Sequence, residues 1–159
     1  MKFPLRQKIL LGLNIIVWIF TITVYYLKVI DTELLRRIVF GYSICIPIYL
    51  LTQETLVDLN NNRIFTVWFI IGLINFAFSL ALKKLGFAWG SALRSFLFFL
   101  LAYKILNYII KDEEGRCLLN TYRQISWTHD TEGVKITGLD VFFNFLLLAV
   151  IILSVLWNL

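Results

Sequence analysis

Histidine and cysteine, which supply many metal and redox sites in proteins, are scarce in this sequence. It contains one histidine and two cysteines, Cys45 and Cys117, and neither cysteine lies in a C-x-x-C motif. This spacing gives poor support for thiol redox chemistry or for a structural zinc site. A single histidine also excludes a haem held by two histidines of one chain. We therefore expect no metal site and no cofactor.

The common catalytic motifs are also absent. The sequence has no Walker loop, no H-E-x-x-H and no G-x-S-x-G. Asp140 stands alone among the apolar segments, which excludes a membrane protease that uses two intramembrane aspartates. His129, Asp130 and Glu132 lie together in a polar stretch, where a solvated turn is a simpler interpretation than a catalytic site. We expect no catalytic residues.

Charge is low and apolar residues dominate. Charged residues make up 16% of the chain and hydrophobic residues 60%, and the mean hydropathy is +0.81. Soluble domains are typically about 45–50% apolar. A chain of 159 residues cannot hide this much apolar surface in one soluble core, so the excess is expected to face lipid.

The net charge of +5 bears on the partners. Basic residues lie next to the apolar runs, which favours contact with anionic lipid headgroups. No basic stripe is interleaved with exposed aromatic residues, so nucleic acid is not an expected partner. The expected surroundings are a lipid bilayer containing anionic lipids.

Five apolar stretches predict an all-α integral membrane protein with about five transmembrane helices in a single domain, residues 1–159. The stretch 38–51 is too short to cross a bilayer unless its flanks extend it. The polar loop is expected over residues 111–138, where alternating residues around Gly133 predict a small β-hairpin and an amphipathic continuation of the preceding helix is the alternative. The predicted spans are 9–27, 36–57, 64–82, 87–110 and 139–157.

The distribution of lysine and arginine predicts the orientation in the membrane. Cytoplasmic segments are enriched in these residues. The basic N-terminus and the loop 111–138 both favour the cytoplasmic side, and five spans allow both to lie there. The C-terminus is then outside. The expected location is a bacterial inner membrane or an equivalent membrane.

Small residues mark the first half of the stretch 87–110. Gly86 and Gly90 form a G-x-x-x-G motif, and Ser91 and Ser95 extend it. Small residues at this spacing let membrane helices approach closely, so we expect a helix–helix or subunit contact here. Arg94 lies on the same segment without an acidic residue at its depth. The structural interpretation of Arg94 is a snorkelling or internally paired arginine, and the functional one is an anion, lipid or pore contact.

Lys104 and Asp140 are expected to form an intramembrane ion pair. In antiparallel neighbours, the end of one helix lies level with the start of the next. Asn107 and Asn144 are expected nearby as hydrogen-bond supports, and Asn144 shares a helix face with Asp140, four residues before it. The structural interpretation is a tie between two helices, and the functional one is a proton or cation relay.

Two smaller expectations concern amides and tryptophans. Asn14 and Asn75 are expected to hydrogen-bond across helices. Trp68, Trp89 and Trp157 lie near segment ends, where tryptophan forms an interfacial belt.

Three functions are consistent with these features. The first is a non-enzymatic, self-associating subunit of a membrane assembly or of an ion or small-solute pore, either as a homo-oligomer or within a membrane complex. The second is a monomeric transporter or lipid-handling protein that uses Arg94 and the Lys104–Asp140 pair. The third is a membrane enzyme that acts on lipid or peptide.

Overall fold

The computed structural model describes residues 4–27, 32–52, 56, 58–84, 92–118 and 136–157. These residues hold five long helices and no strand, so the predicted all-helical fold is confirmed for them. The predicted hairpin falls on residues outside these ranges. The helices are α1 (Leu5–Leu27), α2 (Thr32–Leu50), α4 (Asn62–Lys84), α5 (Arg94–Glu114) and α6 (Gly138–Leu156).

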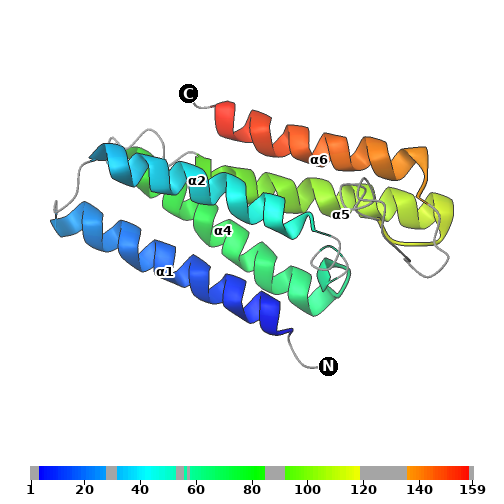
Figure 1. Ribbon diagram of the computed structural model, residues 1–159, viewed down its shortest axis with the longest axis horizontal. Coiled ribbons are helices and arrows are strands. Elements are labelled where there is room, and N and C mark those ends of the chain that lie inside the picture. Colours follow the sequence, from blue (N-terminus) through cyan, green and yellow to red (C-terminus); the bar gives the residue numbers. More distant parts are fainter. Residues whose placement is uncertain are drawn as a thin grey trace, which may run out of the picture.

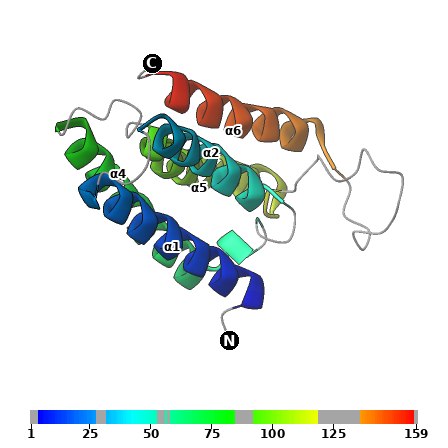
Figure 2. The ribbon, with the colours of Figure 1, turned by 60° about the vertical axis from the view of Figure 1, so that its left-hand side comes forward.

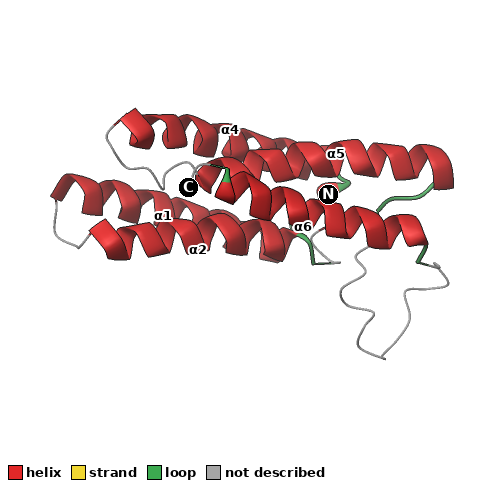
Figure 3. Ribbon diagram, turned by 90° about the horizontal axis from the view of Figure 1, so that it is seen from above, coloured by secondary structure: helices red, strands yellow, loops and turns green. Residues whose placement is uncertain are grey.

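The helices form a bundle in which α5 is central. Successive helices run in opposite directions, so the chain enters and leaves at opposite ends (Figure 1). One side of the bundle is α6, the middle is α2 with α5, and the other side is α1 with α4 (Figures 1 and 2). Seen from above, α6 crosses between the α1–α2 pair and the α4–α5 pair (Figure 3). Accordingly, α5 packs against α2, α4 and α6.

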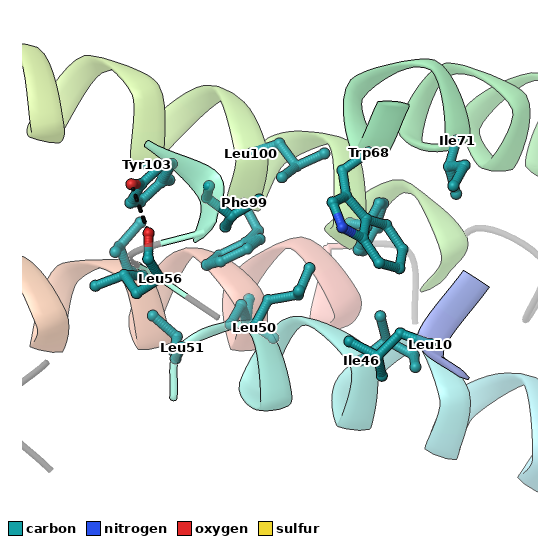
Figure 4. Packing of buried hydrophobic residues seen from close by; sticks show 14 of the residues in the cluster. Leu10, Ile46, Leu50, Leu51, Leu56, Trp68, Ile71, Phe99, Leu100 and Tyr103 are labelled. Carbon is teal, nitrogen blue, oxygen red and sulfur yellow. Dashed lines mark hydrogen bonds between the residues drawn. The ribbon is translucent and has the colours of Figure 1, made fainter. Parts of the chain in front are cut away.

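Large side chains from α4 and α5 fill the interior. Phe96, Phe99 and Tyr103 are fully or almost fully buried on α5, at the spacing of three and four that defines one helix face. Trp68 of α4 faces Leu10 of α1 and residues of α2 across the core (Figure 4). Its indole lies edge-on to the ring of Phe96, with centroids 5.6 Å apart.

Three helices are long and apolar enough to cross a membrane: Leu5–Val24, Asn62–Lys83 and Gly138–Leu156. The apolar part of α2, Arg37–Leu50, is shorter. This helix ends at Leu50, where the sequence predicted a continuation to residue 57. Helix α5 carries Arg94 and Lys104 and ends in three acidic residues.

In the described residues, apolar side chains face outward as well as inward, and several polar side chains are buried. Large apolar side chains point outward from α1, α4 and α6, among them Ile16, Ile70 and Phe145. By contrast, the buried residues include several polar ones: Gln7, Asn14, Thr21, Ser43, Asn75, Ser79, Ser95, Asp140 and Asn144. Water-soluble proteins bury few such groups. This distribution suits apolar surroundings, because each inward polar group is shielded from them.

Candidate functional site

Arg94 is the first residue of α5, so the sequence prediction placed it too deep in a helix. Its Nε donates a hydrogen bond to the Ser79 hydroxyl of α4, at 3.0 Å. Its guanidinium carbon lies 5.7 Å from the ring centre of Phe76, also on α4. Ser79 precedes Lys83 by four residues, which corresponds to about 6 Å along the helix. Arg94 is therefore held about one helical turn from the end of the apolar part of α4.

An apolar groove of about 550 Å³ lies between α5 and α6, and Arg94 is at one end of it. Trp157, which follows α6 and is 86% exposed, lies at the same end. Among the lining residues within the described ranges, Arg94 alone carries a formal charge. The groove is lined by Arg94, Phe98, Ala102, Ile105, Val150, Leu153, Ser154 and Trp157.

Ser95 lies at a contact between α5 and α2. It is fully buried, and its hydroxyl donates a hydrogen bond to the backbone carbonyl of Ser43, at 2.9 Å. In a regular helix that carbonyl would accept the N–H of residue 47, but residue 47 is Pro47 and has no N–H. Ser95 thus satisfies an acceptor that proline leaves open. The other predicted contact residues, Gly86, Gly90 and Ser91, lie outside the described residues.

Lys104 and Asp140 do not meet in the structure. The Lys104 ammonium donates to the Asn62 side chain at 3.2 Å and lies 4.7 Å from the ring centre of Phe65, both on α4. Asp140 is instead bound by Arg116. The physical reason is helix length, because α5 continues to Glu114 and its end, rather than Lys104, is level with the start of α6.

Arg116 binds two carboxylates where α5 meets α6. Its two Nη atoms donate to the two oxygens of Asp140 at 3.1 and 2.5 Å, and Nη2 also pairs with Glu114. Gly115, at a φ of 68°, ends α5 in the left-handed conformation that glycine adopts easily and lets Arg116 turn toward α6. The Thr137 hydroxyl contacts both carboxylates. The hydrogen bond to Asp140 raises the pKa of Arg116, against the effect of its partial burial.

The two asparagines predicted to support the ion pair have separate roles. The side-chain carbonyl of Asn107 accepts the backbone N–H of Leu118 at 2.9 Å, which ties the chain after α5 back to that helix. Asn144 is buried and donates to the backbone carbonyl of Asp140 at 2.7 Å, within α6.

A polar network that sequence reasoning missed joins the start of α1 to α4. Arg6 donates two hydrogen bonds to the Asp58 carboxylate, at 2.7 and 2.9 Å. Gln7 donates to the same carboxylate at 2.9 Å and accepts the indole N–H of Trp68 at 2.6 Å. Trp68 is fully buried, so its predicted place in an interfacial belt is wrong. No local motif signals these contacts, since 52 residues separate Arg6 from Asp58.

Asp58 gives this network a pH dependence. Desolvation raises its pKa, but the hydrogen bonds from Arg6 and Gln7 outweigh that effect, so the pKa falls below its ordinary value. The unfolded chain then binds this proton more tightly than the folded protein does. The contribution to stability is therefore fully present above about pH 4 and is lost as the pH falls through the lower folded pKa.

We expect Asp58→Asn to lower the free energy of unfolding at pH 7 by about 1–3 kcal/mol, the usual range for hydrogen bonds to a charged group. It should also flatten the fall in stability between pH 5 and 3. Detergent-induced unfolding across this pH range measures both effects. Glu113→Gln, which removes an exposed carboxylate of α5, is the control. If the free energy of unfolding of Asp58→Asn fell between pH 5 and 3 as steeply as that of wild type, the role of Asp58 would be contradicted.

Asn75 bonds across helices as predicted, and its partner is Trp18 of α1. The Trp18 indole of α1 donates to the side-chain carbonyl of Asn75 at 2.7 Å. Asn14, one turn earlier on α1, is buried, and its amide atoms have no hydrogen-bond partner among the described residues.

Comparison of the chain with protein-family models, with curated proteins and with solved structures finds no match.

Proposed function

We propose that this chain is a non-enzymatic, multi-pass integral membrane protein that binds a phospholipid in the groove between α5 and α6. The observation that carries the proposal is the composition of that groove. Apolar side chains line most of its length, and a single cation, Arg94, lies at one end. A phospholipid has the same division, with an apolar chain attached to an anionic phosphate.

The outward apolar side chains and the buried polar ones support a membrane location. Three helices have the length and hydropathy of membrane spans. Outward apolar residues would contact lipid chains, and several buried hydroxyl and amide groups bond to backbone carbonyls of their own helix. We further propose that the N-terminus and residues 111–138 face the cytoplasm and that the C-terminus lies outside, because the cytoplasmic side carries more lysine and arginine.

The groove also has the length of one acyl chain in one leaflet. From Arg94 to Ile105, α5 rises about 16 Å, and one leaflet accounts for about half of a hydrocarbon core of about 30 Å. Trp157 lies at the Arg94 end, where an interfacial tryptophan is expected. The chain of a bound lipid would therefore lie along Phe98 and Ala102, with its phosphate near Arg94.

A pore through one protomer has less support than lipid binding. Trp68, Phe96 and Phe99 fill the centre of the described bundle, so a solute would have to displace them. Self-association through the glycine motif at residue 86 stays a separate prediction.

Filling the groove should remove the lipid. Ala102 is a small residue among the groove side chains, so Ala102→Phe places a ring where the acyl chain would lie. We expect wild type purified in mild detergent to retain about one phospholipid per chain and the variant to retain several-fold less. Native mass spectrometry, together with a phosphorus assay, measures this ratio.

The matched control is Ala81→Phe, the same change on the exposed surface of α4. It adds an equal apolar volume outside the groove, so it should retain as much lipid as wild type. Equal lipid retention by wild type, Ala102→Phe and Ala81→Phe would contradict the proposed function.

A further inference from the structure

We propose that the groove selects phospholipids of net negative charge, with a headgroup that carries no amine, over zwitterionic ones. This inference rests on the proposed lipid-binding function and adds to it the class of headgroup. It follows from the charges around the groove, the fixed position of Arg94 and the level of Arg94 in the bundle.

The charges at the Arg94 end favour an anion. Among the groove-lining residues that the structure describes, Arg94 alone is charged, so none of these residues offers a carboxylate to an ammonium group. Glu33 is the only acidic residue at this end of the bundle among the described residues, and it pairs with Arg37 on α2 at 3.5 Å. An anionic headgroup would gain the attraction of Arg94 without an unpaired positive charge of its own. A zwitterionic headgroup would bring an ammonium that the groove does not neutralise.

The position of Arg94 is fixed before any lipid binds. Its Nε is bonded to Ser79, and its guanidinium lies over Phe76. Both partners are on α4, whereas the groove is formed by α5 and α6. A cation held in place from a third helix loses little side-chain freedom when it meets a phosphate, and a guanidinium can bind two phosphate oxygens at once.

The level of Arg94 suits a headgroup rather than a chain. Arg94 lies about one turn inside Lys83, near the end of the apolar part of α4, and it shares this level with Trp157. Charged side chains within about a turn of the interface reach the headgroup layer. The phosphate and its substituent would therefore be close to Arg94, where the charge of the substituent affects binding.

The test compares two lipids with identical chains, dioleoyl phosphatidylglycerol and dioleoyl phosphatidylcholine, added to delipidated protein in mild detergent and counted by native mass spectrometry. We expect wild type to bind the anionic lipid roughly fivefold to tenfold more tightly, the effect of one cation near an anionic headgroup. Arg94→Gln should bind both lipids about equally, because the loss of affinity should be larger for phosphatidylglycerol than for phosphatidylcholine.

Two further variants complete the design. Arg94→Lys keeps the charge and should retain part of the preference for the anionic lipid. Comparison with Arg94→Gln then shows whether the lost preference comes from the lost charge or from misfolding. Lys83→Gln removes an exposed cation on α4 outside the groove and should keep the full preference. A wild-type preference that Arg94→Gln abolishes and Lys83→Gln keeps would support the inference.

Other results would overturn it. A preference that persists in Arg94→Gln would assign selectivity to another part of the chain. If wild type bound both lipids equally and Ala102→Phe bound both more weakly, the groove would still bind lipid. The proposed selectivity for the headgroup would then be wrong. Failure of wild type to bind either lipid would overturn the selectivity and the proposed function together.

Discussion

Arg116→Gln should lower the free energy of unfolding by about 3 kcal/mol, the lower end of the range for breaking a buried ion pair. Its partner Asp140 has a fully buried side chain, and Glu114 is largely buried beside it. Without Arg116, two carboxylates would face each other across Thr137 with no cation to neutralise them. Detergent-induced unfolding, followed by circular dichroism, measures the loss.

The matched control is Arg63→Gln, which removes an exposed arginine at the same end of the bundle. It should change stability by less than about 0.5 kcal/mol. The double variant Arg116→Gln with Asp140→Asn should be more stable than Arg116→Gln alone, because it leaves no unpaired charge at Asp140. If Asp140→Asn instead lowers the free energy of unfolding as much in the Arg116→Gln background as in wild type, Arg116 does not act through Asp140.

The sequence predicted best those helices whose ends are marked by a change from polar to apolar residues. The expected span 64–82 lies within α4, and the expected span 139–157 agrees with α6 to within one residue at each end. The bounds of α5 were harder to predict, because its apolar run begins before Arg94 and the charged residues up to Glu114 are also helical. The C-terminal end of α5 was predicted at residue 110 instead of Glu114, and this difference produced the wrong partner for Asp140.

The candidate site could be predicted only in part. Arg94 was identified from its unusual setting, since a cation in an apolar run needs a physical explanation. Its groove could not be predicted, because the groove depends on which side chains of α5 and α6 leave space between them. The Arg6–Asp58 network was missed for a related reason: hydrogen bonds between distant segments leave no periodic pattern in a sequence.

Ser95 and Pro47 are a further pair whose relation only the structure reveals, and Ser95→Ala tests it. The substitution should lower the free energy of unfolding by about 1–3 kcal/mol, the cost of a buried polar group that loses its partner. The group in question is the Ser43 carbonyl, which has no N–H donor at residue 47. In apolar surroundings, hydroxyl side chains commonly satisfy carbonyls that proline leaves open.

The decisive comparison is Ser95→Ala made in a protein that already carries Pro47→Ala. Alanine restores the N–H of residue 47, so the Ser43 carbonyl can accept a regular helical bond and no longer depends on Ser95. We expect Ser95→Ala to cost about 1 kcal/mol less in this background. Ser154→Ala is the control, because the Ser154 hydroxyl bonds to the Ile151 carbonyl within its own helix, where residue 155 is not proline. Equal costs of Ser95→Ala with and without Pro47 would mean that Ser95 stabilises the α2–α5 contact by packing alone.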